Sequence, residues 1–262
     1  MAEHLNLYQR ASYYDVIFDR DVSREVDFMI AVAEKYIGKA PSGVLDIACG
    51  PGYHAREFTR RGLRAFGSDL QPEMIEFARN KDTAEGLATE WLVADMRQLQ
   101  LDQPVDLAFI AFDGLDALQS NADVIQHLRS VAANLNPGGI YLIDLSHPRN
   151  VNHFYYYPFH YEGDRDGIHV EIDWGLNDPH YDLITNVCRV DLEMRVTTAE
   201  GEEIRVQDAA VERLFLPQEI ILLAELSGVF EVVDWYGDYD FQTPLEDAEA
   251  TRMIAILQKK DS

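Results

Sequence analysis

The chain has 262 residues, of which 47% are hydrophobic, and it carries 46 acidic against 22 basic residues, a formal net charge of −24. This charge argues against nucleic-acid binding, which usually needs a basic surface. No stretch approaches the roughly 18–20 apolar residues of a membrane span, and the N-terminus lacks the basic and apolar regions of a signal peptide. We therefore expect a cytoplasmic protein without a nucleic-acid or membrane partner. The two cysteines, Cys49 and Cys188, are too far apart in sequence to suggest a zinc site.

The first predicted elements lead to a glycine-rich loop. The first twenty residues hold an aromatic cluster, Tyr8, Tyr13, Tyr14 and Phe18. Apolar spacing over 22–37 predicts a helix that ends at Gly38. Residues 44–52, Val-Leu-Asp-Ile-Ala-Cys-Gly-Pro-Gly, then read as a strand that breaks into a loop and leads into a helix. This arrangement is typical of nucleotide-type sites, in which glycines let a ligand approach the backbone where a Cβ would block it.

Strands and helices continue to alternate up to about residue 150. We predict strands over 64–69, 90–94, 105–112 and 140–145, and helices that begin at Pro72 and at residue 121. The strand at 105–112 is almost entirely apolar, as expected of a strand buried on both faces. Residues 136–139, Asn-Pro-Gly-Gly, predict a sharp stop before the fifth strand. The alternation predicts an α/β fold with a doubly wound, mostly parallel sheet.

The pattern changes after about residue 150. Period-2 alternation over 168–174, 188–196 and around 204–206 predicts half-buried antiparallel strands. We therefore expect residues 151–215 to form a small inserted antiparallel β subdomain. The core, residues 1–150 and 216–262, resumes with a helix over 217–227 and strands over 230–236 and 251–257.

Three consecutive predicted strands end in acids: Asp46, Asp69 and Asp95. The carboxyl ends of parallel strands form the ligand crevice of an open α/β sheet, and an acid at the position of Asp69 can accept hydrogen bonds from both hydroxyls of a ribose. Residues 50–55 also fit the fingerprint GxGxx(G/A), which leaves a nicotinamide or flavin dinucleotide as an alternative. Asp46 would disfavour the pyrophosphate of such a ligand. A ligand with a ribose, an ammonium and a sulfonium cation suits the acids better, and S-adenosylmethionine has all three.

Several motifs in order resemble those of the class I S-adenosylmethionine-dependent methyltransferases. Residues 44–52 resemble their first motif, residues 67–70 their second, residues 94–96 their third, and residues 136–139 the turn before their fifth strand. Strands 230–236 and 251–257 resemble their ending, so the resemblance implies a Rossmann-like, seven-stranded, mostly parallel sheet with an antiparallel last strand. Many members have glycine where this chain has Ala48. We expect little effect from this departure, because alanine is small.

The resemblance also implies S-adenosylmethionine as cofactor and a role for each matching residue. Asp69 would hold the ribose hydroxyls, Asp95 would accept from the adenine amino group, and Tyr14 would cover the cofactor. The residues implied to line the cofactor site are Tyr14, Asp46, Ala48, Cys49, Gly50, Gly52, Asp69, Leu70, Asp95, Met96 and Phe112.

The acceptor site is less defined. Methyl transfer is an in-line displacement that depends largely on positioning; an amine acceptor needs no dedicated base, whereas a hydroxyl usually does. His147, after the fifth strand, is the best candidate for such a base, although a loop histidine without a catalytic role is an equal interpretation. Tyr13, Asp113 and Tyr155 are candidate substrate ligands. We expect no metal, because no metal-ligand spacing occurs.

These observations predict methyl transfer from S-adenosylmethionine to a small-molecule acceptor, with N-methylation favoured over O-methylation. The insertion after the fifth strand loosely resembles bacterial amino-sugar N-methyltransferases, and its tyrosines shape either the acceptor pocket or a contact in a homodimer. Two alternatives remain: an NAD(P)-dependent oxidoreductase on a Rossmann core, and a non-catalytic binding protein with the methyltransferase fold.

Overall fold

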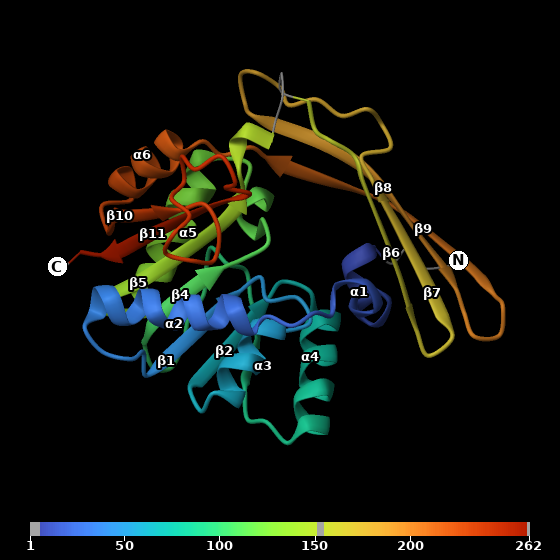
Figure 1. Cartoon of the computed structure of the whole chain (residues 1–262), viewed down its shortest axis with the longest axis horizontal. Helices are drawn as coiled ribbons and strands as arrows, with labels where there is room; N and C mark the ends of the chain where they lie inside the picture. Colours follow the sequence, from blue (N-terminus) through green and yellow to red (C-terminus); the bar gives the residue numbers. More distant parts are fainter. Residues whose placement is uncertain (1–5, 151–154, 261–262) are drawn as a thin grey trace.

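A computed structural model describes residues 6–150 and 155–260, and these form two β-sheets with helices around them (Figure 1). The larger sheet has the order β10-β11-β5-β4-β1-β2-β3, and only β11 runs antiparallel to its neighbours. The predicted seven-stranded, mostly parallel sheet with an antiparallel last strand is confirmed. Its strands are β1 (Gly43–Ile47), β2 (Arg64–Asp69), β3 (Glu90–Val93), β4 (Val105–Ile110), β5 (Leu135–Ser146), β10 (Phe230–Tyr236) and β11 (Arg252–Lys259).

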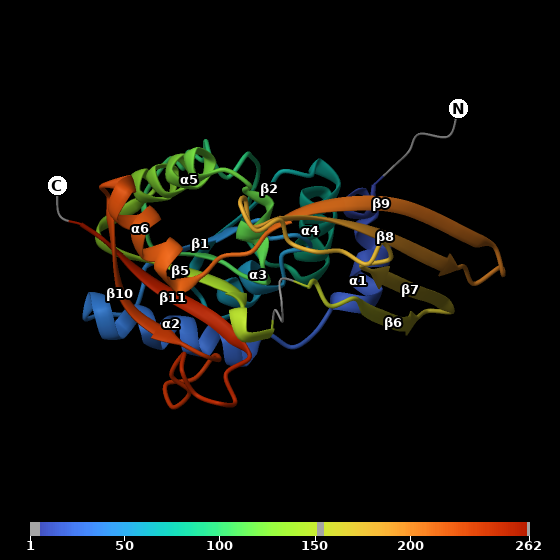
Figure 2. The same cartoon turned by 90° about the horizontal axis from the view of Figure 1, so that it is seen from above.

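Helices cover both faces of this sheet. Helices α2 (Ser23–Ile37) and α3 (Tyr53–Arg60) share one apolar cluster with the sheet, and α5 (Asn121–Ala133) and α6 (Pro217–Ser227) share the other, as Figure 2 shows from above. Strand β1 supplies both clusters because its side chains alternate: Leu45 and Ile47 face one, and Val44 faces the other. Helix α4 (Pro72–Glu85) packs beside β2 and β3. None of the described helices is long and apolar enough to cross a membrane.

The turn expected before the fifth strand lies inside β5. Leu135 already pairs with Val105 of β4, and the register shifts before Ile140 pairs with Leu107. Gly138 has a φ of 69°, in the left-handed region that glycine adopts without strain. The residues that predicted a sharp stop therefore form an irregularity within a continuous strand, because β4 supplies pairing partners on both sides of it.

The second sheet has four antiparallel strands in the order β6-β7-β8-β9. They are β6 (Phe159–Arg165), β7 (Ile168–Trp174), β8 (Val187–Thr197) and β9 (Glu203–Arg213). All four fall within the range 151–215 expected for the insertion, of which residues 151–154 lie outside the described residues. Alternate residues of β8, such as Val190, Leu192 and Met194, are buried on its inner face.

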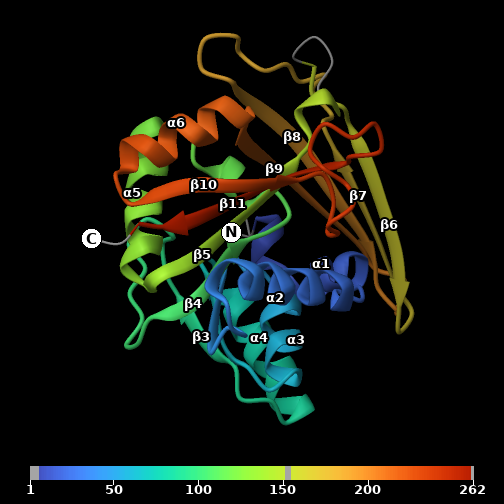
Figure 3. The ribbon, with the colours of Figure 1, turned by 60° about the vertical axis from the view of Figure 1, so that its left-hand side comes forward.

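The N-terminal segment joins the two sheets. It forms η1 (Leu7–Gln9) and α1 (Ala11–Phe18), and α1 lies between the large core and the second sheet (Figure 3). Leu7 is fully buried in the apolar cluster of the second sheet, and Tyr13 and Ile17 pack against that cluster. The sequence analysis assigned this segment to the core, residues 1–150 and 216–262. Its contacts show that it packs against the second sheet as well.

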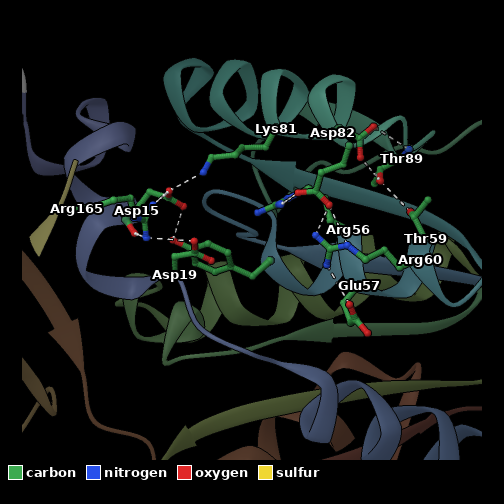
Figure 4. A network of polar contacts seen from close by, with 12 residues as sticks. Asp15, Asp19, Arg56, Glu57, Thr59, Arg60, Lys81, Asp82, Thr89 and Arg165 are labelled. Carbon is green, nitrogen blue, oxygen red and sulfur yellow. Dashed lines mark hydrogen bonds and ion pairs between the residues drawn. The ribbon is translucent and has the colours of Figure 1, made fainter. Parts of the chain in front are cut away.

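One carboxylate fixes α1 in this place. Asp15 is only 1% exposed, and three elements reach it. Lys81 Nζ of α4 lies 3.0 Å from Oδ2, the Tyr53 hydroxyl of α3 donates to Oδ1 at 3.1 Å, and the Arg165 guanidinium of β6 pairs with Oδ2 and donates to the Asp15 carbonyl at 2.8 Å (Figure 4). Asp15 thus links both layers through a single buried charge.

Replacing Asp15 with asparagine is expected to lower the free energy of unfolding by about 2 kcal/mol. Breaking a fully buried ion pair costs roughly 3–5 kcal/mol, and the figure is smaller here because the cations are about a third exposed and screened by solvent. Urea unfolding of Asp15→Asn and of the exposed neighbour Asp19→Asn measures the difference. Equal losses in the two variants would contradict the anchoring role of Asp15.

Candidate functional site

The loop after β1 presents one open glycine and one packed glycine. Gly50 has a φ of 53°, and no atom lies within 4 Å of the position that a Cβ would take. Gly52 also has positive φ, but a Cβ there would lie 2.2 Å from the ring of Trp91, and a Cβ on Gly67 would lie 2.3 Å from the same ring. We expected both loop glycines to make room for a ligand. Only Gly50 leaves open space, whereas Gly52 makes room for the Trp91 side chain.

Ala48 adopts the left-handed conformation that normally selects glycine. Its φ is 54°, so the Cβ of this alanine crowds its own backbone. The expectation that alanine has little effect here considered only its size and missed this backbone requirement. Cys49, the next residue, is buried, and its N–H donates to the Ser68 carbonyl at 2.9 Å; burial raises the pKa of its thiol.

Asp69 lies at the carboxyl end of β2 beside Gly50. Its Oδ2 accepts the Gly50 N–H at 2.9 Å, and its Oδ1 accepts the Gln71 N–H at 2.8 Å. A carboxylate offers about four lone-pair sites, so each oxygen can still accept one more hydrogen bond. Burial raises the pKa of Asp69, and the backbone N–H groups of Gln71, Gly50 and Leu70 oppose that rise. This carboxylate is therefore oriented and able to accept two hydroxyl donors.

The other two strand-end acids have different partners. Asp46 is 3% exposed, and its Oδ2 accepts the Ala55 N–H in the first turn of α3 at 3.2 Å; burial raises its pKa to about 7. Asp95 pairs with Arg97, whose guanidinium lies 2.6 Å from Oδ2 and lowers the pKa of Asp95. Asp46 therefore supports the helix behind the loop, and Asp95 shares its charge with a neighbouring cation.

Exposed apolar side chains lie at the carboxyl ends of β2, β3 and β4, on the edge of the sheet that carries Asp69. Leu70 is 62% exposed after β2, Val93 is 50% exposed at the end of β3, and Phe112 is 47% exposed after β4. Met96 is half-buried and packs against the core. Apolar side chains left open beside a polar group are typical of ligand sites. Val93 was not predicted, because within a strand it looks like an ordinary core residue.

Aromatic residues of α1 cover this region from the second sheet. Tyr14 and Phe18 have ring centroids 4.3 Å apart, and Phe18 also contacts Phe112 at 5.9 Å and Tyr161 of β6 at 5.1 Å. Burial, together with the nearby charge of Asp69, raises the pKa of Tyr14. The structure therefore brings Tyr14 close to Asp69. Phe18 has the most ring contacts here, yet the sequence indicated it only as part of an aromatic cluster.

His147 is poorly placed to act as a base. It is 7% exposed, its Nε2 donates to the Leu245 carbonyl at 2.9 Å, and its Nδ1 accepts the Arg149 N–H at 3.1 Å. Burial also lowers its pKa. Both ring nitrogens are therefore engaged in hydrogen bonds to the backbone of neighbouring loops. This arrangement agrees with the alternative interpretation, a loop histidine without a catalytic role.

The candidate substrate ligands lie apart from one another. Asp113 accepts from the Ser146 hydroxyl at 3.1 Å and pairs with Arg252 at 3.1 Å, so its carboxylate is already engaged. Tyr155 contacts Tyr157 and His180 in a loop of the second sheet, and Tyr13 packs against the apolar cluster of that sheet. The structure does not gather these three residues into one pocket.

Two acids that the sequence analysis did not select lie in elements that contact each other where the sheets approach, and the charge of one acts on the other. Asp116 lies in η2 (Gly114–Ala117), which contacts β9, and Glu212 lies on the inner face of β9, where it accepts from Trp174 Nε1 at 3.1 Å. Burial, then the charges of Asp113 and Glu212, raise the pKa of Asp116, and burial raises the pKa of Glu212. Neither acid forms an ion pair within the described part of the chain.

Buried tyrosines accompany this acid pair. Tyr156 and Tyr181 are 7% and 8% exposed, their ring centroids lie 5.9 Å apart, and the charge of Glu212 raises the pKa of both after burial. The signal for Glu212 was present in the alternation of β9: Ile204 and Val206 face inward, and the same period places residue 212 inward. Both acids are half-buried, and removing a carboxylate from water without an ion-pair partner is costly.

Substituting glycine for Ala48 is expected to stabilise the protein by about 0.5–1 kcal/mol. Relief of the left-handed strain is worth roughly 1–2 kcal/mol, and the added flexibility of the unfolded chain takes back roughly 0.4–1 kcal/mol. Thermal and urea unfolding of Ala48→Gly measures the gain. The control, Ala122→Gly in the exposed first turn of α5, is expected to lose stability, and a loss in both variants would contradict the strain at residue 48.

Known proteins resemble the region around this site. Residues 44–139 match the family described as "Methyltransferase domain". A putative methyltransferase, YqeM of Bacillus subtilis, is 35% identical over 103 residues, 39% of this chain and 41% of YqeM. A dTDP-3-amino-3,6-dideoxy-alpha-D-glucopyranose N,N-dimethyltransferase of Streptomyces fradiae is 26% identical over 137 residues, 51% of this chain and 52% of that enzyme. The matches thus span about half or less of these relatives.

A solved structure shares the fold of this protein over nearly the whole chain. An S-adenosylmethionine-dependent methyltransferase of Clostridium acetobutylicum superimposes with a TM-score of 0.78 over 98% of this chain and 100% of that chain, at 19% sequence identity. At such low sequence identity the superposition shows that the fold is shared and no more. The sequence match is limited to residues 44–139. Residues 44–139 thus resemble a methyltransferase domain in sequence, and the whole chain shares the fold of a solved S-adenosylmethionine-dependent methyltransferase.

Proposed function

We propose that this protein transfers a methyl group from S-adenosylmethionine to the nitrogen of a small-molecule amine. The observation that carries the cofactor assignment is the pairing of Gly50 with Asp69 in a methyltransferase domain. Gly50 leaves open space above the loop, and Asp69 beside it has two acceptor positions left for ribose hydroxyls.

The neighbouring residues suit the rest of that cofactor. Leu70 and Val93 offer exposed apolar surface for the adenine ring, and the rings of Tyr14 and Phe18 lie where they would shield a bound ligand from water. When bound, S-adenosylmethionine supplies an electrophilic methyl carbon on a sulfonium. The acids of the crevice favour a positively charged ligand over the pyrophosphate of a dinucleotide. We therefore favour the methyltransferase over the oxidoreductase alternative.

The acid pair supports an amine as acceptor. Within the part of the chain that the structure describes, neither Asp116 nor Glu212 forms an ion pair, and an ammonium group would offset the negative charge that Arg252 leaves there. Tyr156 and Tyr181 add aromatic surface, which also attracts cations. By its name, the Streptomyces fradiae relative methylates an amino sugar nucleotide on nitrogen. A hydroxyl acceptor would not compensate two carboxylates.

The acid pair can also accept the proton that the acceptor amine must lose. The acceptor must lose a proton so that its nitrogen lone pair can form the new N–C bond as the S–C bond breaks. A carboxylate whose pKa is raised by burial is a better proton acceptor than an exposed one. We assign the binding of the ammonium and the acceptance of its proton to Asp116 and Glu212, and positioning to the aromatic residues around them.

Isothermal titration calorimetry tests the cofactor assignment. The wild-type protein is expected to bind S-adenosylmethionine and its demethylated product, and Asp69→Ala is expected to weaken binding at least about tenfold, because two hydrogen bonds to a charged group are lost. The control Asp102→Ala, in the exposed turn before β4, should leave binding unchanged. Binding of a nicotinamide dinucleotide but not of S-adenosylmethionine would overturn the proposal.

Steady-state kinetics on panels of amines and alcohols test the acceptor. Asp116→Asn and Glu212→Gln are expected to raise the KM for the amine about tenfold or more, with cofactor affinity unchanged and Glu231→Gln on β10 as the control. The KM of the wild type should also rise as the pH falls. Raised pKa values make these carboxylates lose their charge at a higher pH than ordinary acids. Turnover of alcohols but not amines would contradict the assignment.

A further inference from the structure

The outer face of the second sheet carries potential metal ligands that methyl transfer does not use. His160 and Glu162 lie two residues apart on β6 and therefore point to the same face, and Glu171 of β7 is the cross-strand partner of Glu162. One ligand atom from each of these three side chains lies within 4.8 Å of the other two. This face is opposite to the buried one, so the three side chains are open to solvent or half-buried.

A neighbouring carboxylate orients the imidazole. His160 Nδ1 lies 2.7 Å from Asp173 Oδ1, so Nδ1–H donates to Asp173 and the lone pair of Nε2 is left on the side of Glu162, whose Oε2 is 3.8 Å away. Metal-binding histidines commonly donate their other ring N–H to a carboxylate in this way, which fixes the ring and the tautomer. The ladder itself sets this arrangement, because Asp173 is the cross-strand partner of His160.

Glu171 is held in a similar manner. Arg195 Nε donates to its Oε2 at 2.9 Å, which leaves Oε1 for another partner. His169 Nε2 lies 4.0 Å from that free Oε1, while its Nδ1 donates to Asp164 at 2.9 Å. A second imidazole is thus oriented by a carboxylate and has its Nε2 on the side of Glu171.

The local charge also favours a cation. Arg195 pairs with three carboxylates, those of Glu171, Asp173 and Glu193, and Arg205 adds a second positive charge near Glu193, while Glu162 and Asp164 add two more acids to these strands. Glu162 pairs only with His160 among the described residues, and that pair is ionic only if the imidazole is protonated. A divalent cation would offset the excess negative charge that remains.

We propose that His160, Glu162 and Glu171 bind a first-row divalent transition metal, with Zn²⁺ as the representative ion, and that His169 stands ready as a fourth ligand. Mixed imidazole and carboxylate ligands suit Zn²⁺ and its neighbours, whereas Mg²⁺ and Ca²⁺ prefer oxygen ligands alone. Bond lengths of about 2.0–2.2 Å require the ligand atoms to close around the ion, and open side chains can make that movement. Because β6 is the edge strand, the ion would fasten it to β7.

Calorimetry with the metal-stripped full chain, free of any polyhistidine tag, tests this site. Zn²⁺ is expected to bind with one-to-one stoichiometry, and Mg²⁺ at the same concentration is expected not to bind. His160→Ala and Glu171→Gln should each weaken zinc binding at least tenfold. Asp173→Asn, which disturbs only the orientation of the imidazole, should weaken it about 10–100-fold.

The control is His180→Ala, an exposed histidine outside this cluster that should leave zinc binding unchanged. Circular dichroism establishes that each variant is folded, and the absorption spectrum of bound Co²⁺ reports whether nitrogen and oxygen ligands surround the ion. Absence of zinc binding, or binding unchanged by His160→Ala, would overturn the proposal. Neither readout depends on S-adenosylmethionine or methyl transfer, so this site and the proposed function can fail separately.

Discussion

The buried carboxylate of Asp15 is the constraint on which the candidate site depends. The large sheet and the second sheet have separate apolar cores, and α1 lies between them. A buried charge must be matched by partners, and the partners of Asp15 come from α3, α4 and β6. Satisfying one carboxylate therefore fixes the position of α1 against both layers at once. That position carries Tyr14 and Phe18 over the strand ends of the large sheet.

The acids at the strand ends of the large sheet and near β9 differ in the partners they have. Asp46, Asp69 and Asp113 accept hydrogen bonds from backbone N–H groups or pair with Arg252, so their charges are compensated by the protein. Asp116 and Glu212 form no ion pair among the described residues; the charge of Arg252 acts on Asp116, and Glu212 accepts a hydrogen bond from Trp174. Exposed acids are expected in a chain with a net charge of −24. Two half-buried acids that lie between the large sheet and the second sheet are not explained by composition alone. The partners of each carboxylate, rather than the number of acids, therefore distinguish these five side chains from one another.

The sequence predicted the fold well because the fold rests on periodic patterns. Alternating strands and helices, the Gly38 cap and the change to period two after residue 150 each depend on neighbours along the chain. Asp69 and Tyr14 were also predicted, and the structure brings them together. His147 and Gly52 show the limit of such reasoning. Their partners, Leu245 and Trp91, are distant in sequence, and only the folded chain reveals that a ring nitrogen or a missing Cβ is already used.

Trp91 gives the loop after β1 a property that its glycines alone would not provide. A flexible glycine loop must lose conformational freedom when a ligand binds, and that loss weakens affinity. Here one indole ring of β3 fills the space that both Gly52 and Gly67 leave, so the loop rests against a rigid support before any ligand arrives. Packing of Trp91 against Gly52 and Gly67 therefore fixes the conformation of the loop before a ligand binds. Residues 52, 67 and 91 therefore cannot vary independently. A larger residue at either glycine requires a smaller side chain at position 91.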